Sequence, residues 1–286
     1  MRIHTPVFLQ EVLEFLRPKP QSLIIDATAG SGGHAKAILE KGAKVLAIDR
    51  DPEAIKYLKS EHLDNLTVVW GNFTNILEIA QKNGFAQVDG ILFDLGLSSD
   101  QLEDPKRGFA FSKNGPLDMR MDPTLTVRAY DLVNNFSERR LYEIFNTYGQ
   151  EKLSRAIARA ICRTRQIAPF ETTEKLANII REVYWEKRIR TKLDPATKSF
   201  LALRIVVNSE LLNLENALPQ TVEILKYGGR LAIVTFHSLE DSLVKRFFKQ
   251  EKELAVLTKK PITPGALEVF KNPRSRSAKL RVAEKL

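Results

Sequence analysis

Residues 22–34, Ser-Leu-Ile-Ile-Asp-Ala-Thr-Ala-Gly-Ser-Gly-Gly-His, decide the fold of this 286-residue chain. A short apolar run ending in Asp26 leads directly into a glycine-rich turn. Gly30, Gly32 and Ala35 match the pattern G-x-G-x-x-G/A, in which glycine lets a nucleotide cofactor approach the backbone because it has no side chain and tolerates positive φ. The stretch therefore predicts a buried strand, a cofactor-binding turn and the start of a helix.

The same alternation of strand and helix continues along the chain. Short apolar runs bounded by Gly, Asp or Asn are typical of buried parallel strands, and helical patterns separate them. The predicted strands are residues 22–26, 45–49, 66–70 and 88–94, and the helices between them are 35–41, 52–60 and 74–83. This alternation predicts a doubly wound α/β sheet.

Residues 105–206 interrupt the alternation. They show almost no strand pattern, and helical patterns cover residues 126–134, 137–146, 150–166, 173–185 and 195–208. After them come a helix at 209–225, a strand at 230–236, a helix at 239–253 and short strands at 255–258 and 278–283. We therefore expect a sheet domain made of residues 1–104 and 207–286, interrupted by an all-helical insert at 105–206.

Positive charge is concentrated in the insert. The whole chain has a net charge of +9, and residues 105–206 alone carry 20 basic and 11 acidic residues, which accounts for all of it. Local positive charge suits a polyanion, because neutralising phosphates releases counterions, although a solvated surface explains any single cluster. We expect RNA phosphates to contact three clusters: Arg155, Arg159 and Arg163; Lys187, Arg188, Arg190 and Lys192; and Arg274, Arg276, Lys279 and Arg281.

The remaining composition points to a cytoplasmic protein without a membrane segment. No run of 18 apolar residues is present, and the first residues lack the apolar stretch of a secretory signal. The one cysteine, Cys162, cannot form an internal disulfide. The four histidines show no zinc-like spacing, so we expect no protein-held metal.

Two acids strengthen the prediction of a cofactor site. Asp26 ends the first predicted strand, just before the glycine turn, and Asp49 ends the second, where a carboxylate can accept hydrogen bonds from both ribose hydroxyls. The alternative is that each acid only caps a turn or a helix. NAD and S-adenosylmethionine both remain open, but the loop at 94–99 (Asp-Leu-Gly-Leu-Ser-Ser) and the absence of a second βαβαβ half favour S-adenosylmethionine.

Motifs over nearly the whole chain resemble those of the ribosomal RNA small-subunit methyltransferase H (MraW) family. The most specific are residues 115–123, Gly-Pro-Leu-Asp-Met-Arg-Met-Asp-Pro, and residues 236–241, Phe-His-Ser-Leu-Glu-Asp. The other matching stretches are 4–7, 26–34, 46–52, 89–99, 107–111, 147–151, 204–210, 228–231 and 272–277.

The resemblance implies a Rossmann-like S-adenosylmethionine-dependent methyltransferase sheet with a helical insert that helps to bind RNA. It implies methylation of the exocyclic N4 amine of a cytosine in the decoding region of 16S ribosomal RNA, within the small ribosomal subunit, and leaves a homodimer open. The competing interpretations are an NAD-dependent oxidoreductase and a non-catalytic RNA-binding protein.

The resemblance also assigns cofactor contacts to individual residues. It gives backbone contacts to Gly32, Gly33 and His34, and the ribose to Asp49. It places Phe73 and Asp94 along the adenine and methionine sides, and it adds Gln101 to the binding set.

Asp94 is the first candidate for catalysis, because a carboxylate at that strand end can accept the N–H groups of an amine and take up its proton. The alternative is that Asp94 only binds the methionine amine. His237 can orient a group or relay a proton, or it can be a buried, hydrogen-bonded residue. Phe109 or Phe111 can stack on the base, or both can pack in the core of the insert.

Overall fold

The computed structural model describes residues 6–286, so the first two residues of the motif at 4–7 lie outside the described part. The chain divides into two compact units. The first unit contains the residues up to Ser98 together with Leu211–Leu286, and the second contains Ser99–Glu210. The predicted insert, 105–206, falls within the second unit, which extends a few residues further at each end.

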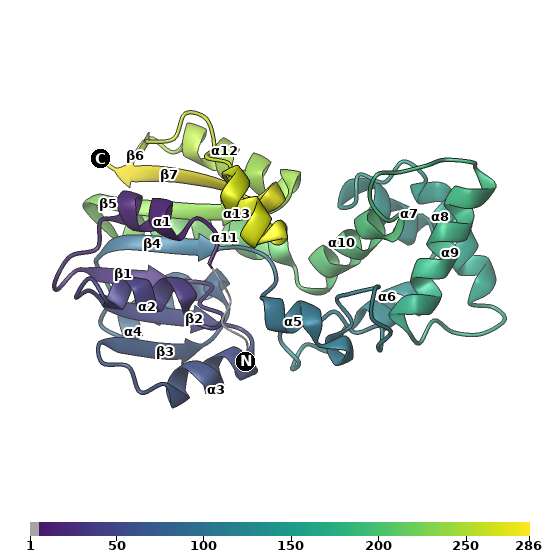
Figure 1. Cartoon of the computed structure of the whole chain (residues 1–286), viewed down its shortest axis with the longest axis horizontal. Helices are drawn as coiled ribbons and strands as arrows, with labels where there is room; N and C mark the ends of the chain where they lie inside the picture. Colours follow the sequence, from purple (N-terminus) through teal and green to yellow (C-terminus); the bar gives the residue numbers. More distant parts are fainter. Residues whose placement is uncertain (1–5) are drawn as a thin grey trace. The chain divides into compact units, whose positions relative to one another are not determined.

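The first unit is built on a seven-stranded sheet with the order β3-β2-β1-β4-β5-β7-β6 (Figure 1). β1 to β5 are parallel, and β7 is antiparallel to its neighbours β5 and β6. The strands are β1 Leu23–Asp26, β2 Lys44–Asp49, β3 Leu66–Trp70, β4 Val88–Asp94, β5 Leu225–Thr235, β6 Leu254–Val256 and β7 Lys279–Lys285. This confirms the predicted Rossmann-like sheet. β5 starts five residues earlier than expected, because Leu225 pairs with Val88 before the two glycines.

Helices connect the strands of this unit. They are α1 Leu9–Leu16, α2 Gly33–Leu39, α3 Pro52–Ser60, α4 Ile76–Lys82, α11 Glu210–Ile224, α12 Ser238–Gln250 and α13 Ala266–Lys271. α3 begins at the N-cap Asp51, whose side chain accepts a hydrogen bond from the backbone N–H of Glu53. α1 and α13 were not predicted.

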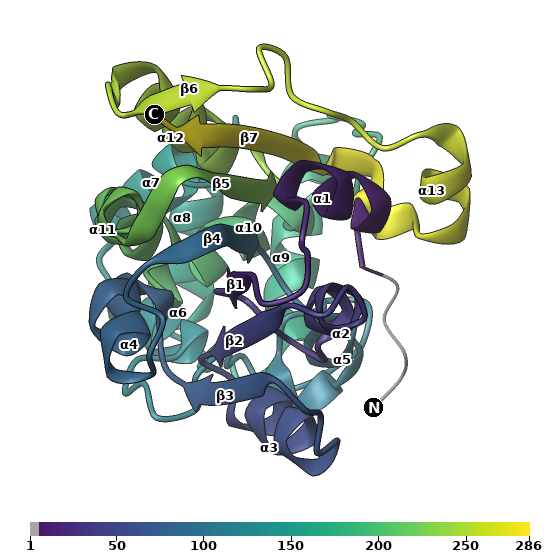
Figure 2. The same cartoon turned by 90° about the vertical axis from the view of Figure 1, so that its left-hand side faces the viewer.

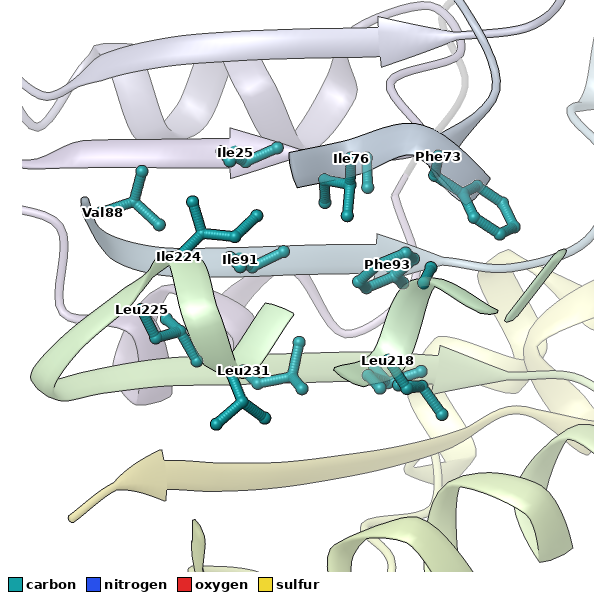
Figure 3. Close-up of a cluster of buried hydrophobic side chains, with 14 of the residues drawn as sticks. Ile25, Phe73, Ile76, Val88, Ile91, Phe93, Leu218, Ile224, Leu225 and Leu231 are labelled. Atoms are coloured by element: carbon teal, nitrogen blue, oxygen red, sulfur yellow. The ribbon is translucent and has the colours of Figure 1, made fainter. Parts of the chain in front are cut away.

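Alternate residues of the strands feed two hydrophobic layers. Ile25, Ile91 and Phe93 belong to a cluster that includes residues of α4, α11 and α12 (Figure 3). Their neighbours Ile24 and Leu92 belong to the other cluster, with residues of α1 and α2. Figure 2, which looks along the strands, shows helices on both faces of the sheet. Burial on both faces explains why the strands are continuous apolar runs.

The second unit is helical. Its helices are α5 Ser99–Glu103, α6 Ala129–Asn135, α7 Glu138–Thr147, α8 Ser154–Thr164, α9 Thr173–Glu186 and α10 Ala196–Val207. Within residues 99–210, all of which the structure describes, no strand occurs, and the only pairing is an isolated bridge between Pro116 and Thr172.

Two predictions about single side chains of the second unit can be compared with the structure. On α8, Arg155, Arg159 and Arg163 are exposed while Ile157 and Ile161 are fully buried, as the spacing predicted. Base stacking by the two insert phenylalanines is not supported. Phe109 is only 6% exposed, and the ring of Phe111 packs edge-on against Phe200 at 5.0 Å between centroids.

The prediction that Arg281 contacts RNA is wrong, and its neighbour Lys279 pairs with the same acid. The Nε atom of Arg281 donates to Oδ1 of Asp241 at 2.7 Å, and Nζ of Lys279 donates to Oδ2 at 2.8 Å. Arg281 is only 6% exposed. The two cations therefore join β7 to α12. Arg281 is too buried to reach a phosphate, whereas the side chain of Lys279 is 38% exposed.

Among residues 6–286, no helix combines the length and the apolar character needed to cross a membrane.

The ion pairs of Asp241 give a test of the fold. Substituting Asp241→Ala leaves Arg281 buried without its counter-charge, and this should lower the free energy of unfolding by about 3 kcal/mol. Urea denaturation at pH 7 measures the loss. The matched control is Glu215→Ala, which breaks the exposed pair with Arg246 (3.4 Å) and should cost less than about 1 kcal/mol. Equal losses in the two variants would contradict the role assigned to Asp241.

The same ion pairs predict a pH dependence. Burial alone raises the pKa of Asp241, but Arg281 and Lys279 outweigh it and lower the pKa overall. A depressed folded pKa stabilises the protein above the unfolded value of about 3.9, and this stabilisation is lost as the pH falls through the folded value. Asp241→Ala should therefore lose less stability than the wild type on acidification, as unfolding followed from pH 6 to pH 3 would show.

Candidate active site

Three carboxylates meet at one edge of the sheet. Asp26, Asp49 and Asp94 are the last residues of β1, β2 and β4, and these neighbouring strands are parallel. The turn after β1 is fastened across this edge. The backbone N–H of Ala27 donates to Leu92 at 2.9 Å, and that of Ala29 donates to Ile48 at 3.0 Å. Ligands of doubly wound sheets bind at this carboxyl edge.

Two glycines of the turn have different tasks. At Gly32, with φ of +80°, an added Cβ would lie 2.4 Å from Cδ2 of Leu58, so glycine allows the turn to pack against α3. At Gly30, with φ of +50°, an added Cβ would meet no atom within 4 Å. The space in front of Gly30 is therefore open to a ligand that approaches the backbone.

Asp49 stands beside this open space. Its Oδ2 accepts a hydrogen bond from the backbone N–H of Gly30 at 2.7 Å, and its Oδ1 accepts one from Asp51 at 2.8 Å. Burial raises the pKa of Asp49, while these two hydrogen bonds oppose the rise. The carboxylate is thus held in one orientation next to the glycine turn. Its contact with a ribose stays a prediction.

The side chain of His34 contributes more than the backbone contact expected from the sequence. Its imidazole is buried, and Nε2 lies 3.5 Å from Oδ2 of Asp94. Burial alone lowers the pKa of His34, but the adjacent carboxylate of Asp94 and the charge of Asp26 outweigh it, so the pKa is raised.

Asp26 completes this charged cluster. It is 1% exposed, and its burial raises its pKa to about 6, against the opposing effects of His34 and of a hydrogen bond from the backbone N–H of Thr28. Asp26, His34 and Asp94 therefore influence one another electrostatically. We call these three residues the edge cluster.

The edge cluster leaves two polar atoms without partners. Nδ1 of His34 and Oδ1 of Asp94 are buried and have no hydrogen bond within the described residues. Unpartnered buried polar atoms are rare in proteins. Together with the open space at Gly30, they fit a polar, partly charged ligand such as the amino-acid part of S-adenosylmethionine.

The other predicted cofactor residues have distinct surroundings. An added Cβ on Gly33 would lie 2.4 Å from Cγ of Pro6, so the residue allows close packing. Phe73 is 6% exposed and packs edge-on against Phe93, with centroids 5.4 Å apart (Figure 3). Gln101 is largely buried and belongs to the second unit. Cofactor contacts by these residues remain predictions.

His237 acts as the N-cap of α12. Its Nδ1 accepts a hydrogen bond from the backbone N–H of Glu240 at 3.4 Å, and the carboxylate of Glu240 accepts one from the backbone N–H of His237 at 3.3 Å. This reciprocal arrangement is a capping box. It supports the structural alternative for His237, and a catalytic role stays a prediction.

Two residues near the edge escaped the sequence analysis. The hydroxyl of Thr28 accepts a hydrogen bond from the backbone N–H of Asp94 at 2.6 Å and so fixes the end of β4. Trp70 pairs in register with Asp49 and is 51% exposed, with its indole N–H donating to Arg50 at 3.1 Å. Trp70 could have been found from the sequence, because it is an aromatic residue at the end of a predicted strand that follows the strand ending in Asp49.

Comparison with known proteins identifies the family. The sequence model of the MraW methylase family matches residues 1–286. The chain belongs to the MraW methylase family. It is 47% identical over 307 residues to the ribosomal RNA small subunit methyltransferase H of Thermomicrobium roseum, covering 99% of this chain and 94% of that protein. It is 46% identical to the protein of the same name from Deinococcus deserti, again covering 99% and 94%.

A member of this family is an S-adenosylmethionine-dependent methyltransferase, which settles the choice between the two cofactors and rules out a non-catalytic role. Among solved structures, a putative methyltransferase from Streptococcus mutans in complex with SAH matches 100% of both chains with a TM-score of 0.47 and 15% identity. A likeness this distant adds nothing to the assignment.

Substituting Gly30→Ala tests the cofactor site. The added methyl fills the open space beside Asp49, so the affinity for S-adenosylhomocysteine, measured by isothermal titration calorimetry, should fall at least about ten-fold, or 1.4 kcal/mol. Gly84→Ala is the matched control, because Gly84 also has a positive φ and nothing within 4 Å of an added Cβ, but precedes β4. Both variants should lose about 1 kcal/mol of stability. Equal affinities would contradict the placement of the cofactor.

Proposed function

We propose that this methyltransferase modifies the exocyclic N4 amine of a cytosine in the decoding region of small-subunit ribosomal RNA. The observation that carries the proposal is full-length identity of 42–47% to curated relatives named ribosomal RNA small subunit methyltransferase H. The basic second unit and the unpartnered oxygen of Asp94 at the sheet edge support it.

The chemical difficulty lies with the cytosine amine, whose lone pair is delocalised into the ring. When bound, S-adenosylmethionine would supply an electrophilic methyl group, and its sulfur–methyl bond would break as the new nitrogen–carbon bond forms, with S-adenosylhomocysteine as the leaving group. Oδ1 of Asp94, which has no partner among the described residues, can accept an N–H of the amine and localise the lone pair on nitrogen. As nitrogen acquires its new bond to carbon, the same carboxylate takes up the proton that nitrogen releases.

The residues around Asp94 hold it in place for this task. The hydroxyl of Thr28 accepts the backbone N–H of Asp94, and Nε2 of His34 lies 3.5 Å from Oδ2 of Asp94. A protonated His34 offers a counter-charge in a site where burial strengthens electrostatic interactions. His34 and Thr28 therefore act through Asp94 as positioning residues.

Incubation with a methyl-labelled donor and unmodified small ribosomal subunits tests the proposed function. We expect one methyl group on the N4 position of one decoding-region cytosine, identified by nuclease digestion and mass spectrometry. Label on another base, on ring carbon or on protein would refute the assignment of the substrate.

Substituting Asp94→Asn separates proton uptake from cofactor binding. Asparagine keeps the shape but cannot take the proton, so kcat should fall by about 10² to 10⁴. The dissociation constant for S-adenosylhomocysteine should change less than ten-fold. Asp64→Asn, at an exposed position of the same unit, is the control and should behave as the wild type. A loss confined to cofactor affinity, with kcat unchanged, would assign Asp94 to the methionine amine instead.

The exposed arginines of α8 predict salt-dependent RNA binding. Neutralising Arg155 and Arg159 together should weaken binding of the small-subunit RNA and reduce the slope of log K against log salt by about 1 to 2. Lys82→Ala is the control, because Lys82 is an exposed cation of the first unit paired with Glu78. An unchanged slope in the double variant would make the α8 arginines an ordinary solvated surface.

A further inference from the structure

The motif at residues 272–277, Asn-Pro-Arg-Ser-Arg-Ser, has no task in the site described above. It forms a 3₁₀ helix, Pro273–Ser277, that directly follows α13 and leads into β7. We call the stretch from Lys259 to Ser277 the edge platform.

The edge platform lies at the end of the sheet that carries Asp94. β7 runs antiparallel to β5, with Lys279 opposite Thr235, so the segment before β7 emerges where β5 ends. β5 in turn pairs with β4, where Val234 is opposite Asp94. Two strand spacings separate β7 from β4, so Leu280, near the start of β7, lies about 10 Å from Asp94, and the platform ends three residues before it. Figure 1 shows α13 beside the start of β7.

Hydrogen bonds attach the edge platform to the rest of the first unit. Ile262 and Leu280 exchange two backbone hydrogen bonds of 3.0 Å each, and the carboxylate of Glu268 accepts the backbone N–H of Phe8 at 2.8 Å. Ser275 is fully buried, and its hydroxyl donates to the carbonyl of Asn272 at 2.8 Å. The platform is therefore a built part of the fold.

The outer surface of this anchored segment is apolar and basic. Phe270 is 83% exposed and Leu267 is 66% exposed, and their i, i+3 spacing places them on one side of α13. Five exposed cations accompany them: Lys259, Lys260, Lys271, Arg274 and Arg276. The only acid of the platform is Glu268, whose carboxylate already holds Phe8.

We propose that the edge platform binds single-stranded RNA next to the target nucleotide, with a base stacked on Phe270 and phosphates on the surrounding cations. Proteins that bind single strands combine an aromatic face, which any base can stack on, with a positive surface that follows the backbone. The positive charge of the platform favours a polyanion such as RNA as its partner over a protein surface that has few acidic residues. The proposal rests on the proposed function, since it concerns how the same RNA is bound.

The test uses the full chain, a fluorescein-labelled single-stranded RNA oligonucleotide and unmodified small subunits. Phe270→Ala should raise the dissociation constant of the oligonucleotide and the KM for subunits by roughly 5- to 100-fold, the loss of one base stack. The value of kcat should stay unchanged. Phe270→Trp should restore both constants, whereas Phe270→Leu, which stays apolar but cannot stack, should resemble Phe270→Ala.

Tyr227→Ala is the matched control. Tyr227 is 85% exposed beside Lys285 (5.8 Å from Nζ to the ring centroid), but it lies at the beginning of β5, the opposite edge of the sheet. It should bind RNA as the wild type does. Circular dichroism and thermal unfolding of each variant show whether the fold is retained.

The outcomes are distinguishable. If the wild type methylates subunits and Phe270→Ala keeps the wild-type KM, the platform is refuted while the proposed function stands. If Phe270→Leu binds RNA as tightly as the wild type, the contact is not stacking. If Phe270→Ala changes only the sedimentation of the protein, the surface joins two copies of this chain. If the wild type neither binds nor methylates RNA, both proposals fall.

Discussion

The rest of the structure depends on the placement of Asp26, His34 and Asp94 together at one end of the sheet. Asp26 is buried and the side chain of Asp94 is only 19% exposed, so two carboxylates alone would be costly there, because they lose hydration without gaining a counter-charge. His34 offsets this cost, with Nε2 at 3.5 Å from Asp94 and a pKa that the two acids raise despite its burial. The sheet and the turn after β1 hold these three side chains close together.

This placement comes from strand register and from the turn after β1. β1 lies between β2 and β4, so the acids at their three ends cannot be far apart. The turn hydrogen-bonds back to both neighbours, at Leu92 and at Ile48. Gly30 then leaves open space beside Asp49, and the family assignment makes S-adenosylmethionine the ligand of this edge. The methyl donor and the proposed proton acceptor thereby share one rigid element.

Much of this edge could be predicted from the sequence, because an apolar run that ends in an acid marks both a buried parallel strand and its carboxyl end. The side chain of His34 could not, since its partner lies 60 residues further along the chain, and only the fold brings them together. The pairing of Lys279 and Arg281 with Asp241 was missed for a related reason. Their alternation along β7 places both toward Asp241, and a count of charges does not reveal such pairing. The sequence predicted a strand starting at residue 230, yet β5 starts at Leu225 and continues through the two glycines before Arg230.

The edge cluster can be tested by measuring the pKa of His34 directly. The chain has only four histidines, so a pH titration of the imidazole resonances by NMR can follow His34, whose resonance is the one missing from a His34→Gln variant. The account predicts that the pKa of His34 lies above 6.5 in the wild type and falls in Asp94→Asn, because that substitution removes the adjacent negative charge. A pKa at or below 6.5 that does not respond to Asp94→Asn would contradict it.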